Sequence, residues 1–283
     1  MAYLFILFGI FFSYANAACS IRDDNGNLIH LQKPAYRIIS LAPDVTEILF
    51  LIGAGTNVIG VMQGSDYPSA AKQIPIVGSY AGLDLEKIIS LHPDLIVTWN
   101  SRQVSTFKKY GIPVYFNDPH HLTDIPRTIK HLGCLTGTSQ SAEYEAALFS
   151  RRLKELERKY HHQKKITLFY QIGSYSLITI NRDSWINQAI TLCGGTNIFA
   201  QVKLAAPEVT WEAVVAANPQ MIISDATDVN WKSRWLKWTA MTAVKNKHLY
   251  SISPDIIERA GPRLLQGVEE MCVDIQNVRG MII

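Results

Sequence analysis

Between Ser139 and His162 the chain reads SQSAEYEAALFSRRLKELERKYHH. Apolar residues recur here at alternating spacings of four and three, with charged residues on the remaining faces, at Ala142, Ala146, Phe149, Leu153, Leu156 and Tyr160. This period predicts one amphipathic helix over 139–162, about 36 Å long if every residue is helical. A short coiled coil is the alternative, but the pattern covers barely three heptads. We interpret the helix as a rigid strut that joins two lobes.

Strand and helix patterns alternate on both sides of this strut. Residues 37–41 (RIISL) form a β-rich run, and a helical pattern begins after Pro43 and stops at Gly53. A further strand is predicted at 95–98, and the alternation resumes at 165–170 after the strut. Such alternation indicates parallel sheets. We therefore expect an α/β fold.

A chain of 283 residues is long enough for two ordinary domains, each with its own core. We assign residues 18–138 to an N-terminal lobe, 139–162 to the strut and 163–283 to a C-terminal lobe. A hairpin around Asn25-Gly26 is expected near the start of the first lobe, because this dipeptide is a strong turn signal.

The two lobes share a sequence pattern. Residues 85–98 (LEKIISLHPDLIVT) align without gaps on residues 211–224 (WEAVVAANPQMIIS), and Glu86 falls opposite Glu212. This match suggests two lobes of one plan. The alternative is that any short helix, proline and buried strand look alike.

The first residues differ from the rest. Residues 3–12 form an apolar run, and Ala15-Asn16-Ala17 has the small-x-small form that signal peptidase accepts. We therefore expect residues 1–17 to be a cleaved export signal, although no Lys or Arg precedes the run. Two alternatives are a buried N-terminal element and lipid attachment at Cys19. Since Asn16 stands where a lipoprotein signal needs an aliphatic residue, soluble export is preferred to the lipid anchor.

Composition and cysteine usage exclude several function classes. The net charge is only +3, and the basic residues around the strut alternate with Glu155 and Glu157, so no nucleic-acid surface is predicted. Export permits disulfides, and the four cysteines, Cys19, Cys134, Cys193 and Cys272, allow three complete pairings. No cysteine has the spacing of a redox or zinc motif, so no metal site is expected.

Candidate binding residues lie where the predicted parallel strands end, because open α/β sheets bind ligands there. These ends and the nearby loops carry aromatic and polar residues such as Tyr67, Tyr80 and Trp99, with few titratable pairs. The sequence has no phosphate-binding P-loop, no G-x-S-x-G motif and no H-E-x-x-H motif. We therefore expect capture of a ligand rather than catalysis. A hydrolase using Ser40 or Ser253 is the less favoured alternative.

Glu86 and Glu212 each follow a plausible helix N-cap, Asp84 or Thr210. A carboxylate there is stabilised by the helix dipole, by about 0.3–1 kcal/mol at an exposed position. Two acids placed equivalently on two related lobes would also present a symmetric pair of anchors to a two-fold partner. Two interpretations of these glutamates are therefore open: each contributes only to the capping of its helix, or the two together dock onto a partner.

Six motifs in order resemble a known family from about residue 21 to the C-terminus: RIISLAP (37–43), SDYP (65–68), LEKI (85–88), HPDLIVTW (92–99), LCGGTNIF (192–199) and ERAGPR (258–263). Together they resemble the periplasmic binding proteins that serve bacterial ABC importers of siderophores, haem and corrinoids, in particular the cobalamin binders. The resemblance implies a class III periplasmic binding protein, with two Rossmann-like lobes, a rigid inter-lobe helix and a cleft that moves little on binding.

The resemblance also implies roles for individual residues. Tyr67, Tyr80, Trp99, Ile172 and the segment Asp255, Ile256, Ile257, Glu258 and Arg259 would line the corrinoid cleft. Glu86 and Glu212 would pair with arginines of the permease, which works with its ATPase, and Cys193 would pair with Cys272. The protein would be a monomer in the periplasm, with cobalamin as cargo and no cofactor.

The predicted pocket departs from the cobalamin pattern. Tyr80, Ile256 and Ala206 stand where a Trp is expected, and Ile172 stands where a Phe is expected. Fewer large aromatic faces weaken packing on a flat macrocycle. A haem or ferric-siderophore binder of the same fold is therefore the alternative, since Tyr67 or Tyr80 could ligate haem iron.

Overall fold

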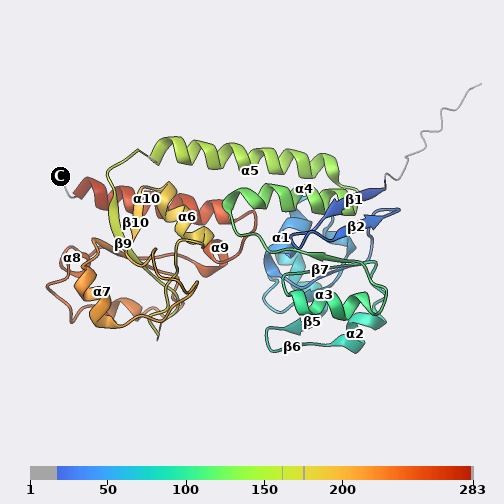
Figure 1. The fold of residues 1–283 in the computed structure, drawn as a ribbon, viewed down its shortest axis with the longest axis horizontal. Coiled ribbons are helices and arrows are strands. Elements are labelled where there is room, and N and C mark those ends of the chain that lie inside the picture. The colour runs from blue at the N-terminus through green and yellow to red at the C-terminus, as the bar shows by residue number, and fades with distance from the viewer. Residues whose placement is uncertain (1–17, 161, 175, 282–283) are drawn as a thin grey trace, which may run out of the picture.

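The computed structural model describes residues 18–160, 162–174 and 176–281. The predicted export signal, residues 1–17, lies outside the described residues. Two α/β lobes lie on the same side of one long helix, α5 (Ser139–Tyr160), as Figure 1 shows. The prediction had this helix reach His162, but α5 ends at Tyr160 and His162 lies in a turn. Within the described residues, no helix is both long and apolar enough to cross a membrane.

The N-terminal lobe is built on a six-stranded sheet of order β6-β5-β4-β3-β7-β8. All neighbouring pairs are parallel except β5 and β6. The strands are β3 (Ile38–Ser40), β4 (Val58–Met62), β5 (Ile76–Ser79), β6 (Gly82–Leu83), β7 (Leu95–Thr98) and β8 (Val114–Phe116). A hairpin of β1 (Cys19–Arg22) and β2 (Leu28–Leu31) precedes them, as predicted around Asn25-Gly26.

Helices cover both faces of this sheet. They are α1 (Pro43–Leu51), α2 (Leu85–Ser90), α3 (Ser101–Lys108) and α4 (Ile125–Thr136), with 3-10 turns η1 (Gly55–Asn57), η2 (Ser69–Gln73) and η3 (Leu122–Asp124). Gly53 has a positive φ of 85°, which ends the helical run of α1 where the sequence predicted.

The C-terminal lobe has a four-stranded parallel sheet of order β10-β9-β11-β12. Its strands are β9 (Ile166–Gln171), β10 (Gly195–Asn197), β11 (Met221–Ser224) and β12 (Leu249–Ser251). Its helices are α6 (Trp185–Leu192), α7 (Trp211–Ala217), α8 (Thr242–Lys245), α9 (Pro254–Ile257) and α10 (Leu264–Met281), with one 3-10 turn, η4 (Trp231–Arg234). The two sheets, one entirely parallel and one parallel except for β6, confirm the predicted α/β fold class.

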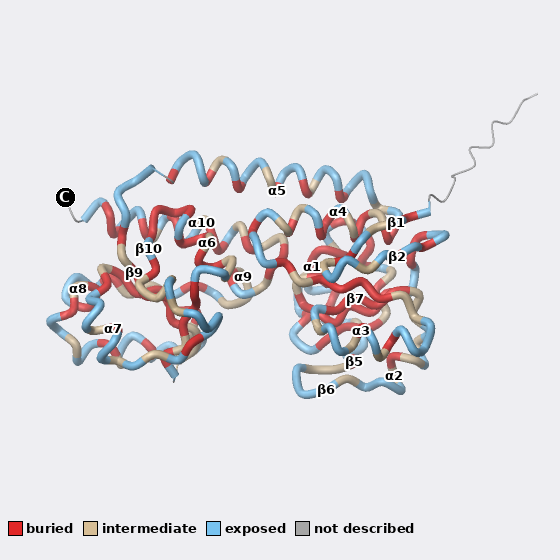
Figure 2. Tube along the Cα trace, viewed as in Figure 1, coloured by how far each residue is buried: buried red, intermediate tan, exposed pale blue. Residues whose placement is uncertain are grey.

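Helix α5 is part of a core that the two lobes share. Its buried residues are the six apolar positions predicted from the sequence: Ala142, Ala146, Phe149, Leu153, Leu156 and Tyr160. In Figure 2 the buried segments of α5 alternate with exposed ones along the helix and lie on its side toward the lobes. The same apolar cluster includes Ile48 of the first lobe and Ile275 of the second. The strut is therefore packed against both lobes by continuous apolar contact.

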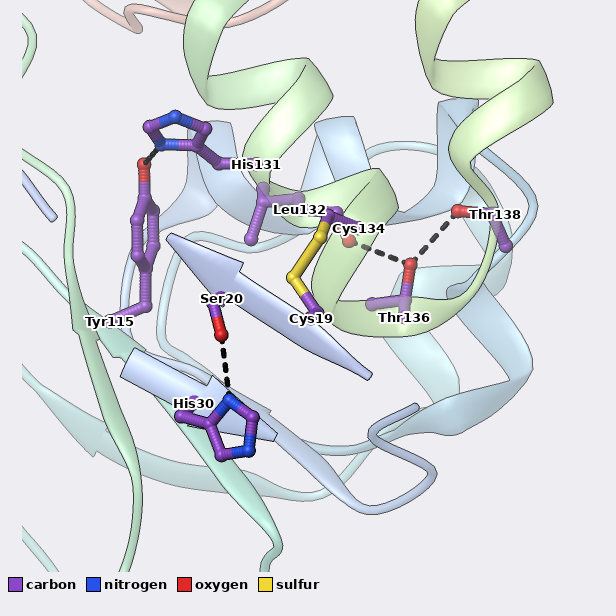
Figure 3. Close-up of a disulfide and its surroundings, with 9 residues drawn as sticks. All are labelled: Cys19, Ser20, His30, Tyr115, His131, Leu132, Cys134, Thr136 and Thr138. Atoms are coloured by element: carbon purple, nitrogen blue, oxygen red, sulfur yellow. Dashed lines mark hydrogen bonds between the residues drawn. A yellow bond between two sulfur atoms is a disulfide. The ribbon is translucent and has the colours of Figure 1, made fainter. Parts of the chain in front are cut away.

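Two disulfides complete the fold. Cys193, which follows α6, pairs with Cys272 on α10, as the family resemblance implied. Cys19 pairs with Cys134, which joins the hairpin to α4 (Figure 3), so the pairing that the sequence left open is settled. Because the Cys19 sulfur is bonded to Cys134, it is not available for a lipid thioether.

Candidate functional site

The loops that follow the parallel strands form the candidate site. In the first lobe β3 lies between β4 and β7. The chain continues from β3 to β4 on one side of β3, and β7, which comes later in the sequence, pairs with β3 on its other side. The helices that follow β3 and β7 pack on opposite faces, since Ile48 of α1 and Phe107 of α3 belong to different apolar clusters. Such a reversal opens a crevice at the carboxyl ends of the strands. In the second lobe β9 has the same central position, with β10 and β11 beside it.

Two aromatic residues lie together at this end of the first sheet. Tyr80 follows β5 and Trp99 follows β7, and their ring centroids are 6.3 Å apart with the planes tilted by 47°. Tyr80 is 75% exposed and Trp99 is 46% exposed. Trp99 is fixed between strand and helix because the side chain of Asn100 accepts a hydrogen bond from the Arg102 amide and caps α3. The pair presents aromatic surface that can pack on a ligand.

The facing segment of the second lobe is α9 and the residues after it. Asp255 and Glu258 reach solvent, whereas Ile256 is partly buried against the core. Ile257 is completely buried and its carbonyl accepts a hydrogen bond from Trp185 Nε1 at 3.0 Å. The buried Ile257 side chain and the hydrogen bond to its carbonyl therefore hold α9 to the second lobe. Ile172, just after β9, also packs partly against the core.

Arg259 links this segment to the first lobe. Its Nη1 lies 3.0 Å from Glu47 Oε1 and 2.9 Å from Asp66 Oδ1, and its Nη2 lies 2.6 Å from Asp255 Oδ1. Burial alone would lower the pKa of Arg259, but the hydrogen bonds to Asp66 and Glu47, together with the negative charges of Asp255 and Asp66, raise it overall. Arg259 is thus a charged group held between the lobes.

The sequence reasoning missed Glu47 and Arg263. Glu47 lies on α1 among apolar residues and is 2% exposed. Arg263 Nε and Nη2 lie 2.8 and 2.6 Å from the two Glu47 oxygens, and the guanidinium carbon lies 4.1 Å from the centroid of the Tyr67 ring. Tyr67, 46% exposed, is therefore a partner of this ion pair as well as a candidate ligand contact. An acidic residue in an apolar helical stripe was the one available signal.

A pair of carboxyl groups lies at the end of the second sheet. Asp225 follows β11, is 3% exposed, and accepts hydrogen bonds from Tyr170 Oη at 2.7 Å and from the Gly173 amide at 2.8 Å. Part of the Glu258 side chain reaches solvent, but burial of its carboxyl group and, second, the adjacent Asp225 carboxyl together raise its pKa to about 7. Burial also raises the pKa of Asp225. The two groups share a hydrogen bond, so one proton between them avoids two adjacent charges.

Glu86 and Glu212 occupy equivalent places on the two lobes. The Asp84 side chain caps α2 by accepting from the Lys87 amide, and Thr210 caps α7 by accepting from the Ala213 amide. Both glutamates are exposed in the first turn of their helices. In Figure 1, α2 and α7 lie far from α5, at the ends of the two lobes.

Ser40, one of the two serines considered for a hydrolase, does not face the candidate site. The Ser40 hydroxyl is completely buried, donates to the Ala42 carbonyl at 3.0 Å and accepts from Thr46 at 2.8 Å. It is therefore tied into the backbone instead of facing a ligand. Among the described residues no group of three or more His, Cys, Asp or Glu side chains could hold a metal ion.

Comparison with known proteins identifies relatives over most of the chain. A family model described as "Periplasmic binding protein" matches residues 38–256. The vitamin B12-binding protein of Vibrio parahaemolyticus is 31% identical over 258 residues, which cover 89% of this chain and 94% of that protein. The vitamin B12-binding protein of Vibrio cholerae is 32% identical over 260 residues, which cover 90% and 94%.

Solved structures agree with these matches. The crystal structure of the periplasmic vitamin B12-binding protein of Vibrio cholerae superposes with a TM-score of 0.81 at 31% identity, covering 87% of this chain and 98% of that one. The periplasmic haem-binding protein of Roseiflexus sp. RS-1 gives a TM-score of 0.75 at 23% identity, covering 87% and 99%, which is a likeness of fold alone. The family resemblance carried by the sequence motifs is thus confirmed, and the chain belongs to the periplasmic binding protein family.

Proposed function

We propose that this protein captures cobalamin or a related corrinoid between its two lobes and delivers it to an ABC importer. The observation that carries the proposal is the similarity, at 31% identity and over 89% of this chain, to a protein named for vitamin B12 binding. The exposed aromatic and charged residues at the strand ends support it, because they suit a large ligand with an apolar ring and polar side chains.

Each lobe contributes a different kind of contact. Tyr80, Trp99 and Tyr67 of the first lobe pack their faces on the corrin ring. From the second lobe, Asp255, Glu258 and Arg259 bond the amide side chains of the ring, with Ile172, Ile256 and the backbone at Ile257 beside them. With Ile172, Ile256 and Ala206 in place of larger aromatic residues, the second lobe relies more on polar contacts than on stacking.

Capture and release need no bond to be broken, so we propose that no residue of this chain is catalytic and that it needs no cofactor. The mature protein acts as a monomer in the periplasm. Glu86 and Glu212 each pair with an arginine of the permease, and the permease works with its ATPase. Their symmetric placement on two lobes supports docking onto a two-fold partner.

Calorimetric titration of the purified protein with cyanocobalamin tests the ligand. We expect saturable binding with one ligand per protein molecule. Parallel titration with haemin, followed by the Soret band, serves as the comparison, since a solved structure of the same fold is named a haem-binding protein. Absence of heat and of any spectral change at high micromolar cyanocobalamin would exclude the corrinoid, and a Soret band from bound haem would favour the other cargo.

A further inference from the structure

A second contact joins the two lobes in addition to α5. The segment that follows α9 lies directly on α1 of the first lobe: a Cβ added at Gly261 would come within 3.3 Å of the Asp44 Cβ and 3.4 Å of its backbone. The glycine therefore permits a close approach of main chain from one lobe to main chain of the other. We call this contact, formed by Asp44, Glu47, Arg259, Gly261 and Arg263, the inter-lobe joint.

Glu47 is the centre of the joint. Its side chain is 1% exposed, and it faces two guanidinium groups that are 16% and 15% exposed, Arg259 and Arg263. Arg263 binds both carboxylate oxygens, which is the two-point geometry that a guanidinium favours. Both arginines belong to the other lobe, more than 200 residues away in sequence, at separations of 212 and 216. The Glu47 carboxylate thus forms ion pairs with two arginines of the other lobe.

The burial of Glu47 explains why its removal should weaken the inter-lobe joint more than removal of Asp66 or Asp255. Arg259 also meets Asp66 and Asp255, whose side chains are 48% and 50% exposed, so solvent screens those pairs. Arg259 and Arg263 repel each other, and Glu47 is the buried charge placed between them. Removing a buried partner leaves the remaining charges uncompensated, which is far more costly than losing an exposed pair.

We propose that Glu47 is a positioning residue that fixes the separation of the two lobes and holds Arg259 toward the ligand. The first half of this proposal, the fixed separation of the lobes, depends only on the inter-lobe joint itself. The second half rests on the proposed function, because it concerns the arginine that would bond the corrinoid. A group held in place before binding loses less freedom when the ligand arrives, so affinity depends on the joint without contact between Glu47 and ligand.

Distances between the lobes in the ligand-free protein test the first half. Nitroxides attached at Lys108 on α3 and Lys245 on α8, both exposed, report the inter-lobe distance by double electron–electron resonance. Ketone-bearing side chains at these positions carry the labels, so both disulfides stay intact. We expect one narrow distribution for the otherwise unaltered protein and a broader one for Glu47→Gln. A Glu47→Gln distribution as narrow as that of the parent would overturn the proposal.

A matched control and a milder variant separate positioning from general damage. Glu143→Gln removes an exposed pair with Lys130, at 2.6 Å between α4 and α5, and should leave the distribution narrow. Arg263→Lys keeps the positive charge but loses the two-point contact, so we expect a broadening smaller than that of Glu47→Gln. If Glu47→Gln does not fold, Arg263→Lys decides the matter, and an unbroadened distribution for it overturns the proposal.

Cyanocobalamin titration of the same proteins tests the second half. We expect Glu47→Gln to weaken binding by roughly two- to tenfold, the cost of ordering one long side chain on binding, and Glu143→Gln to bind as the parent does. Unchanged affinity in Glu47→Gln would overturn the role of Glu47 in holding Arg259. If the parent protein itself fails to bind, the proposed function is wrong, while the distance measurement still decides the joint.

Discussion

Trp99 is the residue on which the ring-packing hypothesis can be tested most directly. It is held between β7 and the capped start of α3, so its truncation removes an aromatic face without freeing a loop. We expect Trp99→Ala to weaken cyanocobalamin binding by about ten- to a hundredfold, or ~1.4–2.8 kcal/mol. Trp99→Phe should retain most of the affinity. Calorimetry measures all of these changes.

Tyr110 provides the control for this experiment. It is 55% exposed but precedes β8, so it lies at the amino ends of the strands of the same sheet. Tyr110→Ala removes a comparable exposed ring and should leave affinity unchanged. Equal effects of Trp99→Ala and Tyr110→Ala would place the ligand elsewhere.

The carboxyl pair at Asp225 and Glu258 makes a prediction about pH. Glu258 has an ordinary pKa of 4.5 that burial raises to about 7 in the folded protein, so the folded state holds a proton that the unfolded state releases. The stabilising contribution of this proton is fully present below about pH 4.5 and is lost as the pH rises through 7. We expect Glu258→Gln to flatten this part of the profile of unfolding free energy against pH, measured by urea denaturation.

A matched carboxylate makes the pH experiment specific. Glu208→Gln removes an exposed acid of the same lobe and should keep the wild-type profile. If Glu258→Gln instead follows the wild-type curve between pH 4.5 and 7, the shared proton is absent.

The residues that sequence reasoning could not place are those whose partners lie in the other lobe. Arg259 was expected to face a ligand, and the structure shows it held by Glu47 across a separation of 212 residues. No local pattern encodes such a pairing, because it depends on how two separately folded lobes meet. Tyr80 and Trp99 could be placed because the carboxyl ends of parallel strands converge in any sheet of this kind.

Among the secondary-structure elements, α2 and α7 carry a prediction about uptake. Each begins with a side-chain cap followed by an exposed glutamate, and the two helices lie at corresponding ends of the lobes. Reversing both charges, Glu86→Lys with Glu212→Lys, should leave cyanocobalamin affinity intact and block transport into reconstituted vesicles. The physical reason is that a lysine repels an arginine on the permease.

A pair of distant acids serves as the control for docking. Glu143→Lys with Glu157→Lys reverses two charges on exposed positions of α5, which lies away from α2 and α7 in Figure 1. Transport should then continue at the parent rate. Normal transport in the Glu86 and Glu212 double variant would mean that both residues only stabilise the first turns of their helices.

The elements themselves were largely predictable because their patterns are local. The spacing of six apolar residues predicted α5, and all six are buried. The gapless match of 85–98 with 211–224 predicted a helix followed by a strand in each lobe, and the structure has α2 with β7 and α7 with β11. The pairing of Cys19 with Cys134 could not be chosen from spacing, since it depends on where the hairpin packs against α4.

At the scale of the whole molecule, three contacts act against relative motion of the lobes. Helix α5 belongs to an apolar cluster that runs through both, and the inter-lobe joint adds buried ion pairs. The third is Gln188 on α6: its Oε1 accepts from the Leu122 amide at 3.1 Å, and its Nε2 donates to the His120 carbonyl at 3.0 Å. A hinge would have to break all three together.

This triple connection predicts that the lobes barely move when the ligand binds. We expect the radius of gyration from small-angle X-ray scattering to change by less than about 1 Å between ligand-free protein and protein saturated with cyanocobalamin, as in pre-organised complexes. A binding protein that closes around a hinge serves as the comparison, because hinge closure compacts the molecule visibly. Gln188→Ala and Glu47→Gln should together enlarge the change, since α5 and the exposed pair of Arg259 with Asp66 would then carry more of the connection between the lobes. Compaction of the parent protein by several ångströms would mean that the strut bends, and that affinity is set by closure rather than by a preformed site.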